Sequence, residues 1–99
     1  MSTIVQTKNI VLSAEREQKI QTLLAKLFRR HTRLQRVTVS LELDENKWYK
    51  VLLTAHWPGK QFAVAGKQPQ LHAAVVDSVK RLNRVLRKNK EKVLQRARK

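Results

Sequence analysis

The chain has 99 residues, and its 22 Lys and Arg against 7 Asp and Glu give a formal net charge of +15. A chain of this length holds one core, so we expect residues 1–99 to form a single domain. The absence of cysteine excludes a disulfide framework, a thiolate nucleophile and a zinc ribbon. Its apolar runs are far shorter than the roughly 20 residues that cross a bilayer, and no signal-peptide pattern opens it, so we expect a soluble, cytoplasmic protein.

The high net charge does not indicate a disordered chain. Hydrophobic residues make up 41% of the sequence, which is only slightly below their share in ordinary globular domains. A folded domain with this charge repels itself, and the usual partner that offsets the repulsion is a polyanion. The composition therefore points to nucleic acid, an anionic membrane surface or an acidic protein.

The first third of the sequence predicts a strand followed by an amphipathic helix. Residues 3–7 favour a strand, which residues 10–12 either continue or leave for a turn. Ser13 is a suitable N-cap for a helix over residues 13–30. Apolar side chains recur in this helix at i, i+3, i+4, i+7 and i+8, which predicts one buried stripe: Ile20, Leu23, Leu24, Leu27 and Phe28.

The middle of the sequence predicts an antiparallel meander of three strands. In residues 36–43 apolar and polar side chains alternate, so one face is buried and the other is wet. A polar turn at residues 44–47 leads to a second alternating run at 48–57. Pro58 and Gly59 then make a turn, and residues 61–65 form a short third strand.

Aromatic side chains in the meander raise the question of a base-stacking platform, which RNA-binding sheets often carry. By alternation Tyr49 and Trp57 share the apolar face that the helices need, so we assign both to the core. Trp48 falls on the opposite face with Lys50 and His56. It is the one aromatic residue that we consider for stacking, and the alternative is an ordinary tryptophan at the rim of a strand.

The last third predicts one long helix that starts near Pro69, a residue suited to the first helical position. We expect this helix to be roughly 18 to 30 residues long, to extend beyond the core and to fray at about residues 94–99. Its apolar stripe consists of Leu71, Val75, Val79, Leu82, Leu86 and Val93. The order β-α-β-β-β-α then predicts an α+β fold, a two-layer sandwich with both helices on one face of a mainly antiparallel four-stranded sheet.

Cations gather in two places. Residues 80–99 hold ten cations and one acid, or +9 of the total, and a solvated helix face would instead mix the two signs. The first helix also ends in a cluster of cations and His31, and the two clusters can line one groove if the helices pack suitably. We therefore predict phosphate contacts from Lys80, Arg84, Arg87 and Lys88 on the last helix and from Lys26, Arg29, Arg30 and Arg33 at the end of the first.

Enzymatic and metal sites find no support in the sequence. His31, His56 and His72 lack the spacing of metal ligands, and there is no nucleophile elbow or phosphate-binding glycine loop. The few acidic residues lie mostly in helix-cap or turn positions. We expect a protein that is not an enzyme and uses no cofactor or metal.

Segments in three parts of the chain resemble the ribosome hibernation-promoting factors, a family also known as ribosome-associated translation inhibitors or sigma-54 modulation proteins. Residues 8–13 (Lys-Asn-Ile-Val-Leu-Ser) are similar to the family's passage from strand to helix. Residues 26–34 resemble its basic end of the first helix. The most specific segment is residues 72–92, where His-Ala-Ala-Val-Val-Asp leads into the basic helix. The sequence departs from the family at His72, where an aromatic is usual, and at residues 68–70.

The resemblance implies a fold related to double-stranded-RNA-binding domains and a short family member, without the acidic tail or the C-terminal dimerisation domain. Such a protein would bind small-subunit rRNA in the decoding channel of bacterial ribosomes, block mRNA and tRNA and inhibit translation. It would favour inactive ribosome dimers in stationary phase, as part of a stress response. The family's basic positions match Lys80, Arg84, Lys88, Lys90 and Lys92, so the resemblance adds Lys90 and Lys92 to the predicted rRNA contacts, whereas Arg87 enters only through its place on the helical wheel.

Two other classes of function remain open at this stage. The first is a general double-stranded nucleic-acid binder, although residues 71–76 carry no lysine cluster of the kind such domains place there. The second is a protein-interaction module that modulates transcription. In every case we expect a monomeric free protein with no membrane partner and no small-molecule substrate.

Overall fold

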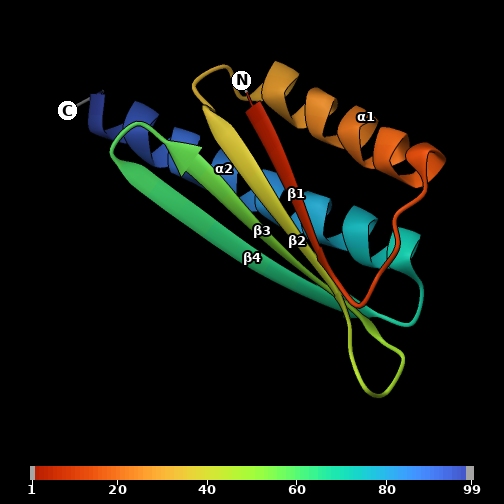
Figure 1. Ribbon diagram of the computed structural model, residues 1–99. Coiled ribbons are helices and arrows are strands. Elements are labelled where there is room, and N and C mark those ends of the chain that lie inside the picture. Colours follow the sequence, from red (N-terminus) through yellow and green to blue (C-terminus); the bar gives the residue numbers. More distant parts are fainter. Residues whose placement is uncertain (1, 98–99) are drawn as a thin grey trace.

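The computed structural model describes the backbone of residues 2–97 and the side chains of residues 2–89. Its element order confirms the predicted β-α-β-β-β-α (Figure 1): β1 (Ser2–Lys8), α1 (Ala14–Arg30), β2 (Arg36–Leu43), β3 (Tyr49–Trp57), β4 (Lys60–Gln68) and α2 (Leu71–Ala97). In the described part of the chain, neither helix combines the length and the apolar character that crossing a membrane requires.

The four strands form one open sheet in the order β1-β2-β3-β4. β2, β3 and β4 make the expected antiparallel meander, while β1 pairs in parallel with β2, so the sheet is mixed. Both helices lie on the same face of this sheet and run in the same direction (Figure 1). The predicted two-layer α+β sandwich is confirmed.

The core fills the space between the sheet and the two helices. Alternate residues of β2 and β3, such as Val39 and Leu53, are fully buried on the helix side, as the period of two predicted. The predicted stripe of α1 is buried except for Leu23, which is half-buried. In α2 the predicted stripe is buried at four positions and half-buried at Val79, while the side chain of Val93 lies outside the described residues. Tyr49 and Trp57 pack against the core, as predicted, and so does Phe62.

Some element boundaries differ from the prediction. Of the two alternatives for residues 10–12, continuation of the first strand is wrong, because Asn9 takes a φ of 61° in the left-handed region and turns the chain. β4 extends to Gln68 rather than ending at residue 65, since all of its residues pair with β3. The expected fraying of residues 94–99 concerns a stretch whose side chains lie outside the described residues, so it stays a prediction.

Asp44 organises the turn between β2 and β3. Its Oδ1 accepts hydrogen bonds of 2.9 Å from the backbone N–H groups of Asn46 and Trp48, and its Oδ2 lies 3.2 Å from Lys67 Nζ. The same ammonium lies 5.8 Å from the centre of the Trp48 ring, within the range of a cation–π contact. The Trp48 backbone N–H, followed by Lys67 and Asn46, holds the pKa of Asp44 below its ordinary value of 3.8.

The stability that Asp44 contributes should therefore depend on pH. A carboxyl whose pKa is lower in the folded state stabilises the fold above its unfolded pKa, and this contribution is lost as the pH falls through the folded pKa. We expect the unfolding free energies of wild type and Asp44→Asn to differ most at neutral pH and to converge below about pH 4. Urea unfolding of both proteins from pH 3 to pH 7 measures this. Glu45→Gln, the neighbouring exposed carboxylate that accepts neither bond, is the matched control. A constant gap between wild type and Asp44→Asn would contradict the assignment.

Gly66 allows α2 to approach β4 closely. A Cβ built at this position would overlap Ser78 Oγ and lie 3.3 Å from the Ala74 carbonyl oxygen. Ser78 is fully buried, and its hydroxyl donates a 2.8 Å bond to the same carbonyl. The helix and the strand are therefore in contact here through backbone and one small side chain.

Gly66→Ala should lower the free energy of unfolding by about 1–3 kcal/mol, because the added methyl group overpacks this contact. Ser78→Ala alone should cost little, because its back-bond to the helix backbone is only weakly stabilising. The double variant should recover part of the loss, since one of the two overlapping groups is gone. Chemical denaturation of the three variants tests this, and additive effects of the two substitutions would refute the proposed contact.

Candidate nucleic-acid interface

Four cations project from α2 into solvent. Lys80, Arg84, Arg87 and Lys88 are all exposed. At about 100° per residue they occupy the side of the helix away from Leu82 and Leu86, which face the core. We call these four residues the α2 ridge. The predicted contacts Lys90 and Lys92 lie outside the residues whose side chains the structure describes.

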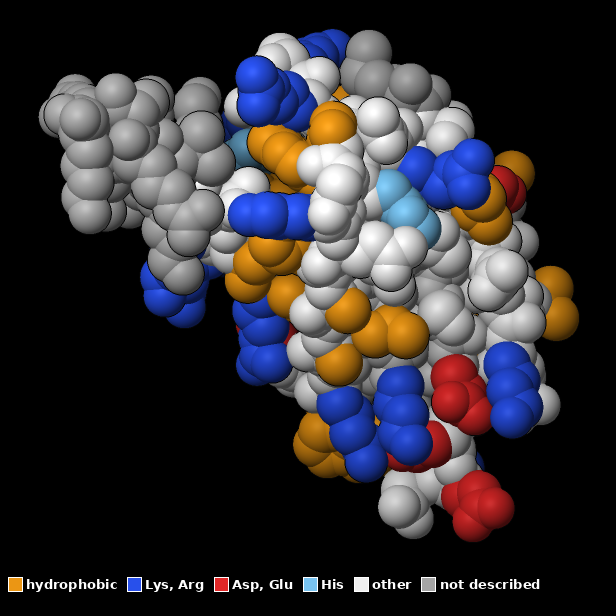
Figure 2. Space-filling view, turned by 90° about the vertical axis from the view of Figure 1, so that its left-hand side faces the viewer, with side chains coloured by type: hydrophobic (Ala, Val, Ile, Leu, Met, Phe, Trp, Pro, Cys, Tyr) orange, Lys and Arg blue, Asp and Glu red, His pale blue; other side chains and the backbone are white. Residues whose placement is uncertain are grey.

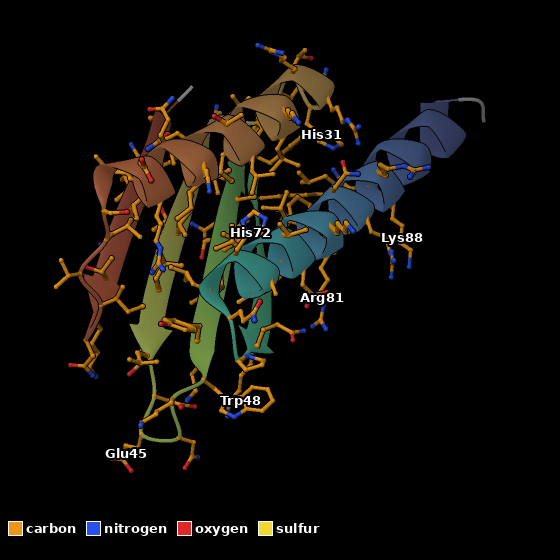
Figure 3. The ribbon with its side chains drawn as sticks, turned by 90° about the vertical axis from the view of Figure 1, so that its right-hand side faces the viewer. His31, Glu45, Trp48, His72, Arg81 and Lys88 are labelled. Carbon is orange, nitrogen blue, oxygen red and sulfur yellow. The ribbon has the colours of Figure 1, made fainter. Side chains whose placement is uncertain are left out.

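Arg81 lies next to the α2 ridge in sequence but is held against the sheet. Its Nε lies 3.3 Å from Asp77 Oδ2, and its guanidinium donates a 3.1 Å bond to the Ala65 carbonyl oxygen of β4. Figure 3 shows Arg81 and Lys88 on separate turns of the same helix. Arg81 thus links α2 to β4.

The cations at the end of α1 divide between two sides of that helix. Lys26 and Arg30 follow Leu23 at i+3 and i+7, on the side of α1 that faces α2. Arg29 instead lines a hollow against β1 together with Thr3. Arg33 is exposed in the turn after the helix. The cations of the expected cluster therefore lie near one another at the end of α1, but only Lys26 and Arg30 are on the side of the helix that faces α2.

His31 ends α1 and joins it to α2. Its side chain is only 4% exposed, so it is not a surface cation of the cluster as its sequence neighbours suggested. Its Nε2 lies 2.8 Å from Asn83 Oδ1, and because that oxygen only accepts, Nε2 donates. The centre of the His31 ring lies 6.5 Å from the centre of the Trp57 ring, in an edge-on arrangement. The backbone N–H of His31 donates a hydrogen bond to the Leu27 carbonyl oxygen at the end of α1. The end of α1 is thereby attached to the middle of α2.

This attachment brings cations of both helices to the surface along the seam between α1 and α2, and we call the part of it that carries Lys26, Arg30, Lys80 and Arg87 the cationic groove. Lys80 and Arg87 stand at i−3 and i+4 from Asn83, so they lie on the side of α2 that meets the end of α1. Lys26 and Arg30 face them from α1. The sequence left open whether the helices run parallel or antiparallel, and the parallel arrangement is the one that places both sets of charge together.

The cations of this groove take part in none of the ion pairs of the described residues. In the described residues the ion pairs are Lys8 with Glu42, Lys67 with Asp44 and Arg81 with Asp77, and none includes a cation of the groove. In Figure 2 several acidic side chains gather at the lower end of the molecule, where Figure 1 places the turn between β2 and β3, and others stand higher up. Among the described residues, no ion pair neutralises the cations of the groove.

Two polar side chains that the sequence analysis did not consider help to build this end of the molecule. Asn83 receives the bond from His31, and Asn89, itself buried, accepts a 3.3 Å bond from Lys60 Nζ at the start of β4. The two asparagines are six positions apart and stand among the cations of α2. The only signal in the sequence that could have pointed to them is an uncharged polar residue within this basic segment. Among the described residues no three His, Asp or Glu side chains come together as a metal site.

Trp48 lies far from the groove. It is 40% exposed at the turn between β2 and β3, where Lys67 covers its ring. Figure 3 places Trp48 and Glu45 at the end of the molecule opposite His31. The tryptophan that we considered for base stacking therefore belongs to the hairpin and not to the cationic groove.

The chain matches the family model described as Sigma 54 modulation protein / S30EA ribosomal protein over residues 3–94. No curated protein sequence matches it significantly. A ribosomal subunit interface protein from Coxiella burnetii has a similar structure, with a TM-score of 0.85 and 12% identity over 92% of this chain and 99% of that one. The Protein Y N-terminal domain from Thermus thermophilus follows with a TM-score of 0.75 and 21% identity, over 87% and 93% of the two chains. At these identities the two structures support the fold alone.

Asn83→Ala should detach the end of α1 from α2. It removes the acceptor of the buried His31 N–H, and an unsatisfied buried donor costs about 1–3 kcal/mol. We expect the free energy of unfolding in urea to fall by that amount. Asn46→Ala, the same substitution at an exposed turn position, should change it by less than about 0.5 kcal/mol. Equal stabilities of the two variants would show that the His31–Asn83 bond does not hold the helices.

Proposed function

Because the chain belongs to the Sigma 54 modulation protein / S30EA ribosomal protein family, we propose that it binds the small ribosomal subunit and inhibits translation by occupancy. In this proposal it lies against rRNA in the decoding channel, blocks mRNA and tRNA, and promotes inactive ribosome dimers in stationary phase. It acts without catalysis, in the cytoplasm and as a monomer when free.

The observation that carries the proposal is the groove with exposed cations on both helices, which form no ion pair with an acidic residue in the part of the chain whose side chains are described. Like charges at i and i+4, such as Lys80 with Arg84 and Arg84 with Lys88, destabilise an isolated helix by a few tenths of a kcal/mol per pair. Phosphates that bind there remove this repulsion and release counterions. A-form RNA suits such a surface, since its backbone and shape are what proteins mostly recognise.

A general duplex-RNA binder would need cations at the start of its second helix, and α2 does not offer them. Its first turns bury Leu71, Ala74 and Val75, and His72 is the one ionisable side chain before Asp77. Competition of ribosomes against generic duplex RNA separates the two functions. Preference for the duplex would overturn the ribosomal proposal.

The triple variant Lys80→Glu, Arg84→Glu, Lys88→Glu should no longer sediment with ribosomes in a sucrose gradient, while its circular-dichroism spectrum stays that of wild type. The matched control reverses three other exposed lysines, Lys8, Lys47 and Lys50, so its net charge changes by the same amount. We expect the control to keep most of its binding, because these lysines lie away from the groove. Equal loss in both variants would mean that total charge matters and the α2 ridge does not.

Salt provides an independent measure of the same contacts. If six to ten phosphates are neutralised, binding to 30S subunits should weaken by roughly 10³–10⁵ between about 50 and 200 mM salt. The triple variant should show a shallower slope for any residual binding. A flat salt response of the wild type would contradict phosphate binding by the groove.

A further inference from the structure

A cavity of about 710 Å³ opens between the starts of the two helices, at the end of the molecule away from the α2 ridge. Pockets that take small organic groups measure about 300–1,000 Å³, so this one is large enough for a nucleobase with its sugar. Its inner wall is apolar and well packed: Ile20, Leu71 and Val75 are each at most 7% exposed. Neither the family match nor the cationic groove accounts for it.

The cavity combines an apolar wall, an aromatic ring and positive charge. Tyr49, at the start of β3, lines it from the sheet side and is half-buried. Arg16 and Lys19, both exposed on the first turns of α1, line it from one side. His72 lines it from the start of α2, where Figure 3 shows it. No Asp or Glu is among the lining residues.

We propose that this cavity binds an unstacked RNA nucleotide, with the base against Tyr49 and the apolar wall and its phosphate at Arg16 and Lys19. Proteins recognise RNA sequence chiefly in single-stranded regions, where bases splay out and stack on aromatic rings. A flat aromatic face is sequence-tolerant, while apolar walls exclude water from the base edges. For its class of ligand the proposal rests on the RNA binding proposed above.

A row of residues on α1 leads from the cavity toward the cations at the end of that helix, and this favours RNA over an acidic peptide. On α1 the residues Lys19, Leu23, Lys26 and Arg30 follow one another at i, i+4, i+7 and i+11, so they form one row along the helix. The row begins at the cavity and ends beside His31, about 16 Å further on at 1.5 Å per residue. One strand with regularly spaced phosphates can follow such a row and leave a base in the cavity. A peptide has no such regular charge.

Titration of the full ¹⁵N-labelled chain with adenosine and uridine 5′-monophosphates tests the proposal by NMR. We expect saturable shifts of the backbone amides of Lys19, Tyr49 and Leu71. Ribose 5-phosphate, which has no base, should bind there more weakly. If ribose 5-phosphate produces the same shifts with the same affinity, the site is a simple anion site and the proposal is wrong. It is equally wrong if an acidic peptide with apolar residues shifts these amides while the mononucleotides do not.

Two substitutions of Tyr49 distinguish stacking of its ring on the base from apolar packing alone. Tyr49→Leu keeps an apolar side chain but loses the ring, and it should weaken mononucleotide binding about 5- to 150-fold, the range found for base–aromatic stacking. Tyr49→Phe retains the ring and should bind as wild type does. If Tyr49→Leu binds as tightly as Tyr49→Phe while both keep the wild-type melting temperature, stacking is excluded.

The charged rim has its own variant and control. Arg16→Gln with Lys19→Gln should weaken the binding of mononucleotides but not that of the free nucleosides, because only the phosphate contacts are removed. Lys47→Gln with Lys50→Gln removes the same charge elsewhere and should leave both unchanged. Equal losses in the two pairs would refute a local phosphate site.

The outcomes distinguish this inference from the proposed function. If the protein sediments with ribosomes but mononucleotides leave the cavity amides unmoved, the function stands and the nucleotide site is wrong. If mononucleotides bind in the cavity but the protein does not sediment with ribosomes, the nucleotide site stands and the ribosomal proposal is wrong.

Discussion

The common direction of the two helices is the constraint on which the rest of the structure depends. α1 connects β1 to its parallel neighbour β2, so it must run opposite to both strands. β4 points the same way as β2, because two antiparallel pairings separate them, and α2 returns from its end. The helices are therefore parallel, and they share one face because the chain builds one core. The end of α1 then meets the middle of α2, where His31 and Asn83 join them.

Much of the fold follows from the sequence because its signals are local. Alternation assigned the buried face of β2 and β3, and the 3.6-residue period found the stripes of both helices. The direction of the helices was not predictable in this way, since it depends on the parallel pairing of β1 with β2, a contact between segments about 34 residues apart. His31 shows the same limit: its neighbours in sequence are cations, yet the partners that bury it, Asn83 and Trp57, come from distant elements. The cavity between the helix starts likewise has no local signature.

The positive charge of the molecule serves two purposes that the structure keeps apart. Some cations form internal links: Arg81 ties α2 to β4, Lys67 secures the hairpin at Asp44, and Lys60 reaches Asn89. The α2 ridge makes no such link among the described residues, and its like charges work against the helix that carries them. A surface that costs stability when empty and loses this cost when phosphates bind is suited to a protein that acts by occupying an RNA site.

The groove between the helices also changes character along its length. Near its end, Lys80, Arg87 and Arg30 offer charge in solvent, which provides affinity but cannot distinguish one phosphate from another. Near its start, Tyr49 and the apolar wall offer shape and a stacking surface, which respond to the base. Both ends lie on the same pair of parallel helices, so one strand of RNA can meet both at a fixed spacing. If both proposed sites bind RNA, selectivity for a structured site follows from the need to satisfy the charged end and the apolar end together.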